Sequence, residues 1–396
     1  MCWQRQAIGQ ELPFRRPGCA ADAGPGDRAQ GWAQVTSDTN SEVDARSTAR
    51  MHAALDELCR RYDVPACGVA VLVAGRKPLI EIAGQRRRDR PGSVAIGDRW
   101  HIGSCAKAAT ALTYARLVER GIANWETPVA ELFADLGTGI HPDWRNRTID
   151  EVFHCRAGIP ANLTKPQMIA AWDSREPLTS QRTTIASHAL SKAPLAPGQF
   201  VYSNLGYILI GAAIDRIVGI LTPEMDFERA LMALVLHPLG IKTGGFGPPP
   251  EICGHSCRFR VGPITLGRGS PVEASNLRND NPPVMNSAGR LHLSMPDWAR
   301  LQAEFLDHAS LFLRKETYDR LLASPSSQRP AMSMGWAHVK LGGRALQGSN
   351  TLWGATAVMD YSRRCMVLIT CNDGRSRVLR AQLRVSAQLC ADATAC

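Results

Sequence analysis

The chain has 396 residues, 44% of them hydrophobic and 21% charged, which is typical of a globular protein with a sizeable core and excludes a fibrous or largely disordered chain. Lys and Arg outnumber Asp and Glu by 46 to 36, a net charge of +10, but aromatic residues make up only 6% and are not interleaved with basic blocks, so we expect no nucleic-acid partner. The longest apolar runs are shorter than the ~20 residues of a membrane-spanning helix, so we expect no membrane span.

Residues 1–45 are predicted to form a mobile N-terminal tail, because they are rich in Gly, Pro, Ala and Asp and lack hydrophobic periodicity. They contain no continuous apolar segment of the kind that signal peptides carry, which favours a cytoplasmic location. Folded sequence is expected to begin near Ser47 with a helix. A Val-rich buried strand at 67–74 and its hairpin partner at 79–83 should follow.

The middle of the chain is predicted to be mostly helical, with loops that contain Pro and Gly. Three helices stand out in this region, of which Gly121 should end the first and Gly219 the second. Ser294 and Asp297 stand three residues apart, as in a capping box, at the start of the third. The helices are expected at 104–120, 204–218 and 295–306.

Strands return beyond Met332, and a closing helix follows. The strands are expected at 335–341, 345–347, 352–359 and 365–371, and the helix at 378–390. Strands at both ends with helices between them predict an α+β fold, in which one antiparallel sheet is built from both chain ends, flanked by helices, with an inserted, mostly helical region. Two independent domains in series would leave the N-terminal hairpin alone, which is marginal in water.

This division assigns the chain to three parts and predicts where a site would lie. The tail ends at residue 45, the sheet-containing part comprises 46–100 and 311–396, and the helical part comprises 101–310. A ligand site is expected at the seam between the last two parts.

The twelve cysteines are scattered and form no Cys-x-x-Cys pair, so reduced, partly buried thiols are expected. The segment Cys253-Gly-His-Ser-Cys257 could supply three metal ligands. No second Cys/His pair stands at the spacing of a structural zinc site, so we expect no metal.

A candidate nucleophile opens the Ala-rich helix, in the stretch His101-Ile-Gly-Ser-Cys-Ala-Lys107. Ser104 and Lys107 stand three residues apart and therefore share one helix face. A Ser hydroxyl attacks well only when a neighbouring base takes its proton, and a partly buried Lys at a helix N-terminus can help. The same N-terminus offers N–H groups to an oxyanion. The alternative is an N-cap Ser with a solvated Lys, which the apolar helix that follows makes less attractive.

A second candidate element is Tyr202-Ser203-Asn204, which precedes an almost wholly apolar helix. In an extended segment, residues 202 and 204 point the same way, so a phenol and an amide could face one pocket. The phenol could transfer protons and the amide could orient a partner by hydrogen bonding. The alternative is an ordinary Asn cap after a Tyr in a turn.

Taken together, these motifs resemble the serine β-lactamase-related proteins, and most closely the branch of class C β-lactamases, D-aminopeptidases and family VIII esterases. The order and spacing fit over about residues 50–390. The resemblance rests on Ser104-x-x-Lys107, on Tyr202-x-Asn204 within Phe200-Val-Tyr-Ser-Asn-Leu-Gly-Tyr207, and on Gly348-Ser-Asn-Thr-Leu-Trp353 before a strand. Three further stretches support it: Cys155-Arg-Ala-Gly-Ile159, His237-Pro-Leu-Gly-Ile241 and Asn281-Pro-Pro-Val-Met-Asn-Ser-Ala-Gly-Arg290.

The resemblance implies a catalytic role for each side chain of the first two motifs. Ser104 would be the acylated nucleophile. Lys107 and Tyr202 would move its proton, and Asn204 would hold Lys107 and the substrate carbonyl. These roles agree with what the side chains can do.

The resemblance also implies an oxyanion hole and substrate contacts. The hole would be formed by the backbone N–H groups of Ser104 and Ser349. Gln347, Gly348 and Asn350 would contact the substrate.

One departure from the family concerns its third motif, which carries Lys or His, then any residue, then Gly. In register with that Gly, this chain has Leu346-Gln-Gly348, so the cation is missing. Lys340-Leu-Gly342 spells the motif but lies too early in the sequence, and Cys155 occupies a position where relatives often have His. Recognition of a buried carboxylate normally needs a paired charge, which argues against β-lactams and D-peptides. Arg344 or Gln347 could substitute for the cation.

We therefore predict a serine hydrolase that works through an acyl-enzyme on a small-molecule acyl substrate, esterase-like and acting on neutral esters or amides, without a cofactor. The alternatives are an acyltransferase or cyclase of specialised metabolism on the same fold, a β-lactamase or D-peptidase, and a catalytically weakened homologue that binds a ligand. The sequence leaves the oligomeric state open.

Overall fold

The computed structural model describes residues 39–256, 259–261, 264–266, 269–273, 275–307, 312–325, 330–338, 343–349 and 352–393. Contacts divide the chain into two units, residues 1–42 and 43–396, and every strand belongs to the second unit. Helix α1 (Thr39–Asp56) begins inside the stretch predicted as a tail, because nothing between its ends is Pro or Gly and so nothing interrupts a helix. Residues 1–38 of that predicted tail lie outside the described residues.

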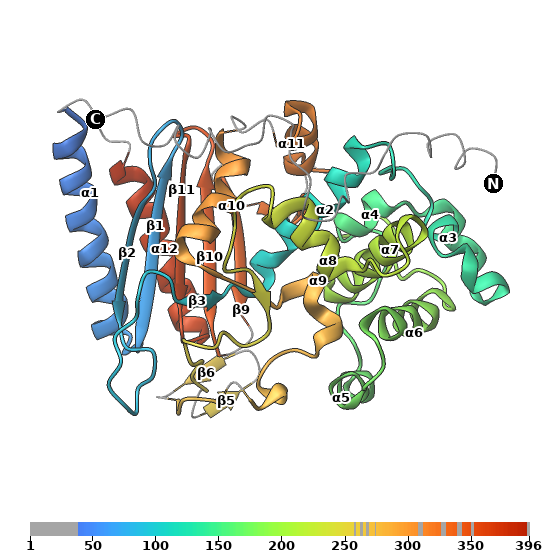
Figure 1. Cartoon of the computed structure of the whole chain (residues 1–396), viewed down its shortest axis with the longest axis horizontal. Coiled ribbons are helices and arrows are strands. Elements are labelled where there is room, and N and C mark those ends of the chain that lie inside the picture. Colours follow the sequence, from blue (N-terminus) through green and yellow to red (C-terminus); the bar gives the residue numbers. More distant parts are fainter. Residues whose placement is uncertain are drawn as a thin grey trace, which may run out of the picture. The chain divides into compact units, whose positions relative to one another are not determined.

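A six-stranded sheet is built from both ends of the chain, as predicted (Figure 1). Its strands run in the order β2-β1-β11-β10-β9-β8, and all neighbours are antiparallel. The N-terminal hairpin joins the C-terminal strands where Cys67 pairs with Cys371 and Val73 with Cys365. The strands are β1 (Ala66–Val73), β2 (Leu79–Gly84), β8 (Ala337–His338), β9 (Arg344–Ser349), β10 (Gly354–Asp360) and β11 (Cys365–Cys371).

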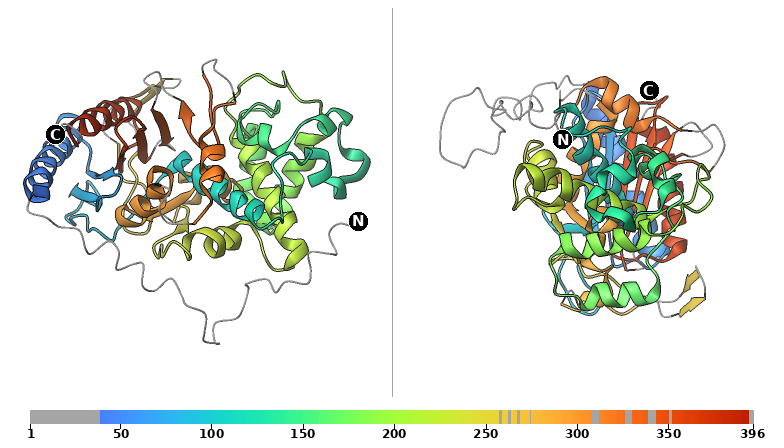
Figure 2. Two further views of the ribbon diagram at one scale, coloured as in Figure 1. Left: turned by 90° about the horizontal axis from the view of Figure 1, so that it is seen from above. Right: turned by 90° about the vertical axis from the view of Figure 1, so that its right-hand side faces the viewer.

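The central strands β1 and β11 are buried on both faces, and successive residues of each strand point to opposite sides of the sheet. From β1, Val69 and Val71 pack into a core with α1 and α12 (Ser376–Ala393). Ala70 and Leu72 face the larger core, which contains α10 (Met295–Asp307) and the helical part. In the left view of Figure 2, α12 accordingly lies on one side of the strands and α10 on the other.

The inserted region is mostly helical, as predicted. Its helices, with α11 after it, are α2 (Ala106–Glu119), α3 (Val129–Leu132), α4 (Ile149–Phe153), α5 (Lys165–Asp173), α6 (Leu178–Leu190), α7 (Asn204–Leu221), α8 (Phe227–Leu231), α9 (Asn286–Gly289) and α11 (Lys315–Leu322). Shorter helical turns are η4 (Glu57–Arg61), η5 (Gly103–Cys105), η6 (Ala134–Gly139), η7 (Pro142–Asn146), η8 (Met232–Leu236), η9 (Leu277–Asn279) and η10 (Pro283–Met285). A separate two-stranded ladder joins β5 (Phe259–Val261) to β6 (Ile264–Leu266).

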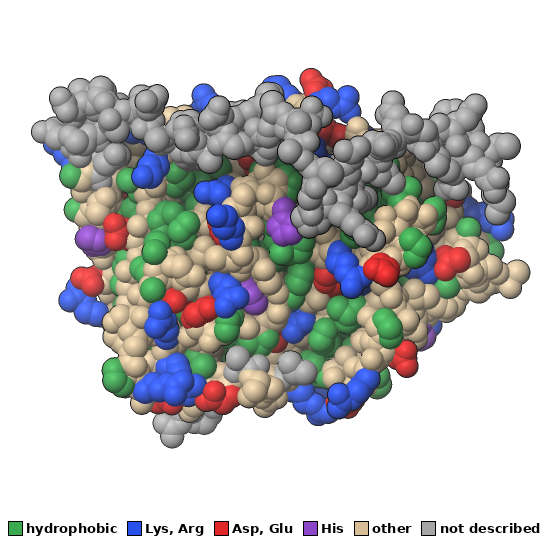
Figure 3. All heavy atoms as spheres, in the orientation of Figure 1, with side chains coloured by type: hydrophobic (Ala, Val, Ile, Leu, Met, Phe, Trp, Pro, Cys, Tyr) green, Lys and Arg blue, Asp and Glu red, His purple; other side chains and the backbone are tan. Residues whose placement is uncertain are grey.

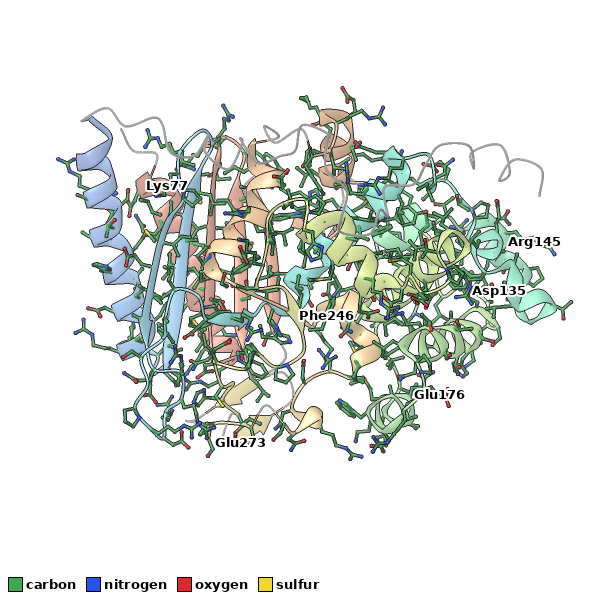
Figure 4. The ribbon with its side chains drawn as sticks, viewed as in Figure 1. Lys77, Asp135, Arg145, Glu176, Phe246 and Glu273 are labelled. Atoms are coloured by element: carbon green, nitrogen blue, oxygen red, sulfur yellow. The ribbon has the colours of Figure 1, made fainter. Side chains whose placement is uncertain are left out.

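A small sheet that the sequence pattern does not predict leads into the first helix of the insertion. It has the order β3-β7-β4, with β3 (Arg99–His101), β7 (Leu291–Ser294) and β4 (Gly245–Phe246). Phe246, labelled in Figure 4, packs against Phe227 of α8 with ring centroids 6.3 Å apart. This sheet therefore ties the strand before the candidate nucleophile to the helical part.

Helix α7 is the core helix of the insertion. It continues past Gly219 to Leu221, three residues beyond its predicted end. Among the described residues it is the one helix long and apolar enough to cross a membrane, but 67% of its 18-residue window is buried inside the protein. A core helix passes the same test, and this burial explains its apolar sequence.

The capping box predicted at the start of α10 is only half formed. The backbone N of Asp297 donates to Ser294 Oγ over 3.3 Å. The Asp297 carboxylate does not reach back, because it accepts hydrogen bonds from the backbone N of Lys242 (2.9 Å) and from the backbone N (2.8 Å) and the hydroxyl (2.7 Å) of Thr243. It thus links α10 to the segment before β4.

Charged side chains are mixed on the surface. Over the part of the face in Figure 3 that is not grey, Lys and Arg side chains are interspersed with Asp and Glu and form no continuous basic surface. This distribution agrees with the expectation of no nucleic-acid partner, which stays a prediction.

Candidate active site

The candidate nucleophile lies in a tight turn between β3 and α2. Ser104 is the middle residue of η5, and Gly103 before it has φ +53°, a conformation that favours glycine. A Cβ on Gly103 would lie 2.7 Å from the backbone N of Ser349, and a Cβ on Gly348 would lie 2.5 Å from the backbone N of Ser104. The end of β9 therefore rests directly on the turn, and only glycines allow this approach.

Lys107 lies one helical turn further along, with its side chain fully buried at 0% exposure. Its Nζ donates to Ser104 Oγ (3.2 Å), to Asn204 Oδ1 (2.8 Å) and to the backbone O of Ala288 (2.5 Å). These three acceptors match the three hydrogens of an ammonium group.

Two aromatic rings enclose the same ammonium. Lys107 Nζ lies 5.0 Å from the ring centroid of Tyr202 and 5.1 Å from that of Tyr207. A cation beside two ring faces is stabilised electrostatically where water cannot reach it. Tyr207 is itself fully buried, and its hydroxyl donates to the backbone O of Phe153 over 3.3 Å.

Tyr202 completes the surroundings of the serine. Its hydroxyl donates to Ser104 Oγ over 2.8 Å, and the residue is 39% exposed, so it stands on the open side of the site. Ser104 Oγ thus lies between a buried amine and an exposed phenol. Because hydroxyl protons rotate, the same contacts let Ser104 donate to whichever partner is deprotonated.

Asn204 is held by the start of α7. Ser203 caps this helix, with its Oγ accepting from the backbone N of Gly206 (2.7 Å) and donating to the backbone O of Pro160 (2.7 Å). The Asn204 side chain accepts from Lys107 through Oδ1 and donates through Nδ2 to Asn162 Oδ1 over 2.7 Å. The orientation of the amide is therefore fixed at both ends.

Most of the predicted site residues lie around the serine turn. The structure brings Ser104, Lys107, Tyr202 and Asn204 into one hydrogen-bonded cluster. The backbones of Gly348 and Ser349 lie against the serine turn.

The remaining predicted residues of the third motif are located by register or fall outside. Gln347 pairs with Thr356 of β10, and Leu346 pairs with Ala357. Asn350 and the segment 340–342 lie outside the described residues.

Three contacts of this cluster were not predicted from the sequence. The Ala288 carbonyl and Asn162 each bind a motif residue, and Tyr207 lines the lysine. Ala288 and Tyr207 lie within stretches that carry the family resemblance, which was the available signal. Asn162 stands in a loop with no pattern of its own, so nothing in the sequence pointed to it.

Cys155 supplies no charge at this site. It is buried, burial raises the pKa of its thiol to about 11, and the backbone N of Val201 donates to its carbonyl over 3.0 Å. The thiol is therefore neutral at ordinary pH and acts as a small packing residue.

The possible metal ligands of 253–257 are engaged elsewhere. His255 Nδ1 lies 2.9 Å from the backbone O of Asn372, and its Nε2 accepts from the backbone N of Arg88 over 3.1 Å. Cys253 Sγ donates to the backbone O of Val272, and Cys257 lies outside the described residues. Within the described part of the chain, no group of three or more His, Cys, Asp or Glu residues could hold a metal ion. Six of the cysteines described there are reduced thiols: Cys59, Cys67, Cys155, Cys253, Cys365 and Cys371.

Comparisons with known proteins agree with this geometry. The family model described as Beta-lactamase matches residues 44–389. No curated protein matches the chain.

Three similar solved structures are SurE, the octameric penicillin-binding protein homologue from Pyrococcus abyssi, and a class C beta lactamase from Rhodobacter sphaeroides. SurE has a TM-score of 0.70 at 19% identity, over 87% of this chain and 76% of SurE. The Pyrococcus protein has a TM-score of 0.66 at 19% identity, over 86% of this chain and 77% of its own. The Rhodobacter enzyme has a TM-score of 0.67 at 17% identity, over 86% of this chain and 98% of its own. At these identities the likeness concerns the fold alone.

Proposed function

The chain belongs to the Beta-lactamase family of serine hydrolases, and we propose that it forms an acyl-enzyme at Ser104 and acts on neutral esters or amides. One observation carries the proposal: Ser104 Oγ lies 3.2 Å from the Lys107 amine and 2.8 Å from the Tyr202 phenol. A serine within hydrogen-bond reach of two groups that can take its proton has what nucleophilic catalysis needs.

In the proposed acylation, Ser104 Oγ attacks the substrate carbonyl, and its proton passes to whichever of the Lys107 amine and the Tyr202 phenol is deprotonated. The backbone N–H groups of Ser104 and Ser349 would stabilise the oxyanion, since both lie where β9 meets the turn. Tyr202, on the exposed side, would return the proton to the leaving group as the bond to the carbonyl breaks. A water molecule would then attack the carbonyl of the acyl-enzyme and give its proton to the same group. Ser104 Oγ would leave and recover a proton, which releases the acid.

Asn204 and Asn162 would orient the amine in this scheme. Their hydrogen-bonded pair holds one acceptor against Lys107 Nζ, and the Ala288 carbonyl holds another. The remaining direction of the ammonium points to Ser104 Oγ. Fixed acceptors of this kind reduce the reorganisation that proton transfer requires.

The preference for neutral substrates rests on the third motif. Leu346 stands where the family carries Lys or His, so the site has no cation at that position. A substrate carboxylate would need such a charge in a desolvated cleft. We therefore expect p-nitrophenyl butyrate to be turned over and a chromogenic cephalosporin to be left intact.

The assay compares wild type with Ser104→Ala and with Ser191→Ala, which removes an exposed serine after α6. Ester release by wild type and Ser191→Ala, but not by Ser104→Ala, supports the proposal. Cephalosporin turnover would assign the chain to the β-lactamase alternative. Faster release on adding amines or alcohols, with a transfer product, would assign it to the acyltransferase alternative.

A further inference from the structure

A buried histidine lies directly behind the serine turn. His101 ends β3, is 1% exposed, and its Nδ1 accepts a hydrogen bond from the backbone N of Gly103 over 3.1 Å. Its Nε2 lies 3.2 Å from Asp280 Oδ2. The imidazole therefore bridges a carboxylate and the residue before Ser104.

These contacts assign the tautomer of His101. A backbone N–H can only donate, so Nδ1 carries the lone pair and Nε2 carries the proton that is donated to Asp280. The Asp280 carboxylate is fixed in turn by Arg290 Nε (3.0 Å) and by the backbone N of Asn281 (2.7 Å). The ring is also stacked on Trp353, with centroids 5.2 Å apart and planes inclined by 18°.

The same network reaches the lysine from the other side. Arg290 donates through its NH1 group to Asn286 Oδ1 over 2.8 Å, and Asn286 donates to Glu228 over 2.9 Å. Asn286 and Arg290 thus anchor both ends of α9, whose residue Ala288 accepts from Lys107. One set of buried polar contacts holds both the serine turn and an acceptor of the lysine.

We propose that His101 is a positioning residue for the serine, and that its Nδ1 acceptor holds the Gly103 peptide so that Ser104 Oγ and N–H point into the site. Gly103 has φ +53°, and the backbone N of Ser349 occupies the space that a Cβ on Gly103 would need. The orientation of the peptide between Ile102 and Gly103 therefore sets the orientation of the peptide that follows. The next peptide carries the Ser104 N–H. The inference rests on the proposed function of Ser104.

The test exploits the different reach of two amides. In Asn, the amide oxygen is bonded directly to Cγ, as Nδ1 is in His. In Gln, the amide oxygen and nitrogen lie one bond further along the side chain, at about the position of Nε2 in His. His101→Asn can therefore keep an acceptor for Gly103, while His101→Gln keeps a group for Asp280 and loses that acceptor. With p-nitrophenyl butyrate we expect His101→Gln to lower kcat by roughly 10- to 100-fold with KM nearly unchanged, and His101→Asn to stay within about threefold of wild type.

The matched control is His292→Gln. His292 pairs with His101 across the β3–β7 ladder and is also buried, but its Nδ1 contacts the Gly247 carbonyl (2.9 Å) and not the serine turn. It should keep the wild-type kcat even if the thermal midpoint falls. Wild-type kcat in a folded His101→Gln, equal losses in both His101 variants, or a loss in KM alone would overturn the inference.

A second measurement needs no variant and keeps the inference testable if His101→Gln fails to fold. In the 15N-labelled wild-type protein, two-bond 1H–15N spectra should show His101 as the neutral Nε2–H tautomer at the pH of the assay. An Nδ1–H tautomer or an imidazolium would overturn the inference. If the tautomer is found but Ser104 turns over no ester, the proposed function fails and the network is structural.

Discussion

At the scale of single residues, the site depends on glycines that leave room for backbone. A Cβ on Gly348 would lie 2.4 Å from the backbone O of Ile102 and 2.5 Å from the backbone N of Ser104. Gly348→Ala must therefore push β9 off the turn and spoil the oxyanion site, at a cost of about 100-fold or more in the acylation rate.

The rate of labelling by a fluorophosphonate measures this effect. Gly97→Ala is the matched control, because a Cβ there would meet nothing within 4 Å. Wild-type labelling of Gly348→Ala would show that Ser349 N–H is not needed where we place it.

Lys107 gives a second prediction at this scale. Lys107→Arg leaves a cation at this position that cannot act as a base, since a guanidinium is not deprotonated in proteins. Ester turnover should fall by about 10³-fold or more, nearly as far as in Ser104→Ala, because the residues act as a unit. Measurement of kcat with p-nitrophenyl butyrate checks this, with Lys165→Arg on exposed α5 as control. Residual activity above about a tenth of wild type would exclude Lys107 as the essential base.

The sequence was informative on motif residues and silent on their partners. Ser104 with Lys107, and Tyr202 with Asn204, could be paired from local spacing, because neighbouring residues on one helix or segment share a face. Asn162 and the Ala288 carbonyl enter the cluster only through folding of distant segments. Local spacing carries no information about such contacts.

At the scale of secondary structure, the start of α7 connects stability to the site. Ser203 caps this helix, whose first residue is Asn204, and Tyr202 directly precedes the cap. Ser203→Ala should lower the free energy of unfolding by about 1 kcal/mol in urea and also lower kcat, because both flanking residues lose their anchor.

The comparison for this prediction is Thr164→Ala, which removes the exposed cap of α5. It should cost a similar free energy of unfolding with no change in kcat. If Ser203→Ala leaves kcat at the wild-type value, the cap has no part in placing Tyr202 and Asn204.

Elements with clear periodicity were predicted well, and short ones were not. The N-terminal hairpin and α2, α7, α10 and α12 appear close to their expected bounds. The small sheet of β3, β7 and β4 was missed because its strands have three, four and two residues, too few for an alternating pattern. Its pairing comes from tertiary packing.

At the scale of the whole molecule, buried histidines should make stability depend on pH. Burial lowers the pKa of His292 to about 4, against 6.5 for an exposed histidine. Between these two values the unfolded chain binds a proton that the folded protein does not. The contribution of His292 to the free energy of unfolding is therefore complete above pH 6.5 and decreases as the pH falls toward 4. One such residue contributes on the order of 3 kcal/mol over this window.

Urea unfolding of wild type and His292→Gln at pH 5, 6 and 7 isolates this contribution from that of the carboxyl groups. The difference between the two proteins should shrink as the pH falls. A difference that stays constant from pH 7 to pH 5 would contradict a neutral His292.

The fold class could be predicted from the order of the elements, because the N-terminal hairpin finds further strands to pair with only if it joins the C-terminal strands in one sheet. The α+β fold and the family resemblance are confirmed. The exact joining of the chain ends, with Cys67 opposite Cys371, could not be predicted, because every strand there is buried on both faces and no alternating pattern sets the register.

The measurement that tests the central claim most directly is the intact mass of the protein after incubation with a fluorophosphonate. Ser104 Oγ would displace fluoride, so we predict a single adduct on wild type, mapped to the peptide that contains Ser104, and none on Ser104→Ala. No adduct on folded wild-type protein, or an equal adduct on Ser104→Ala, would contradict an acyl-enzyme at Ser104 and favour a homologue that only binds its ligand.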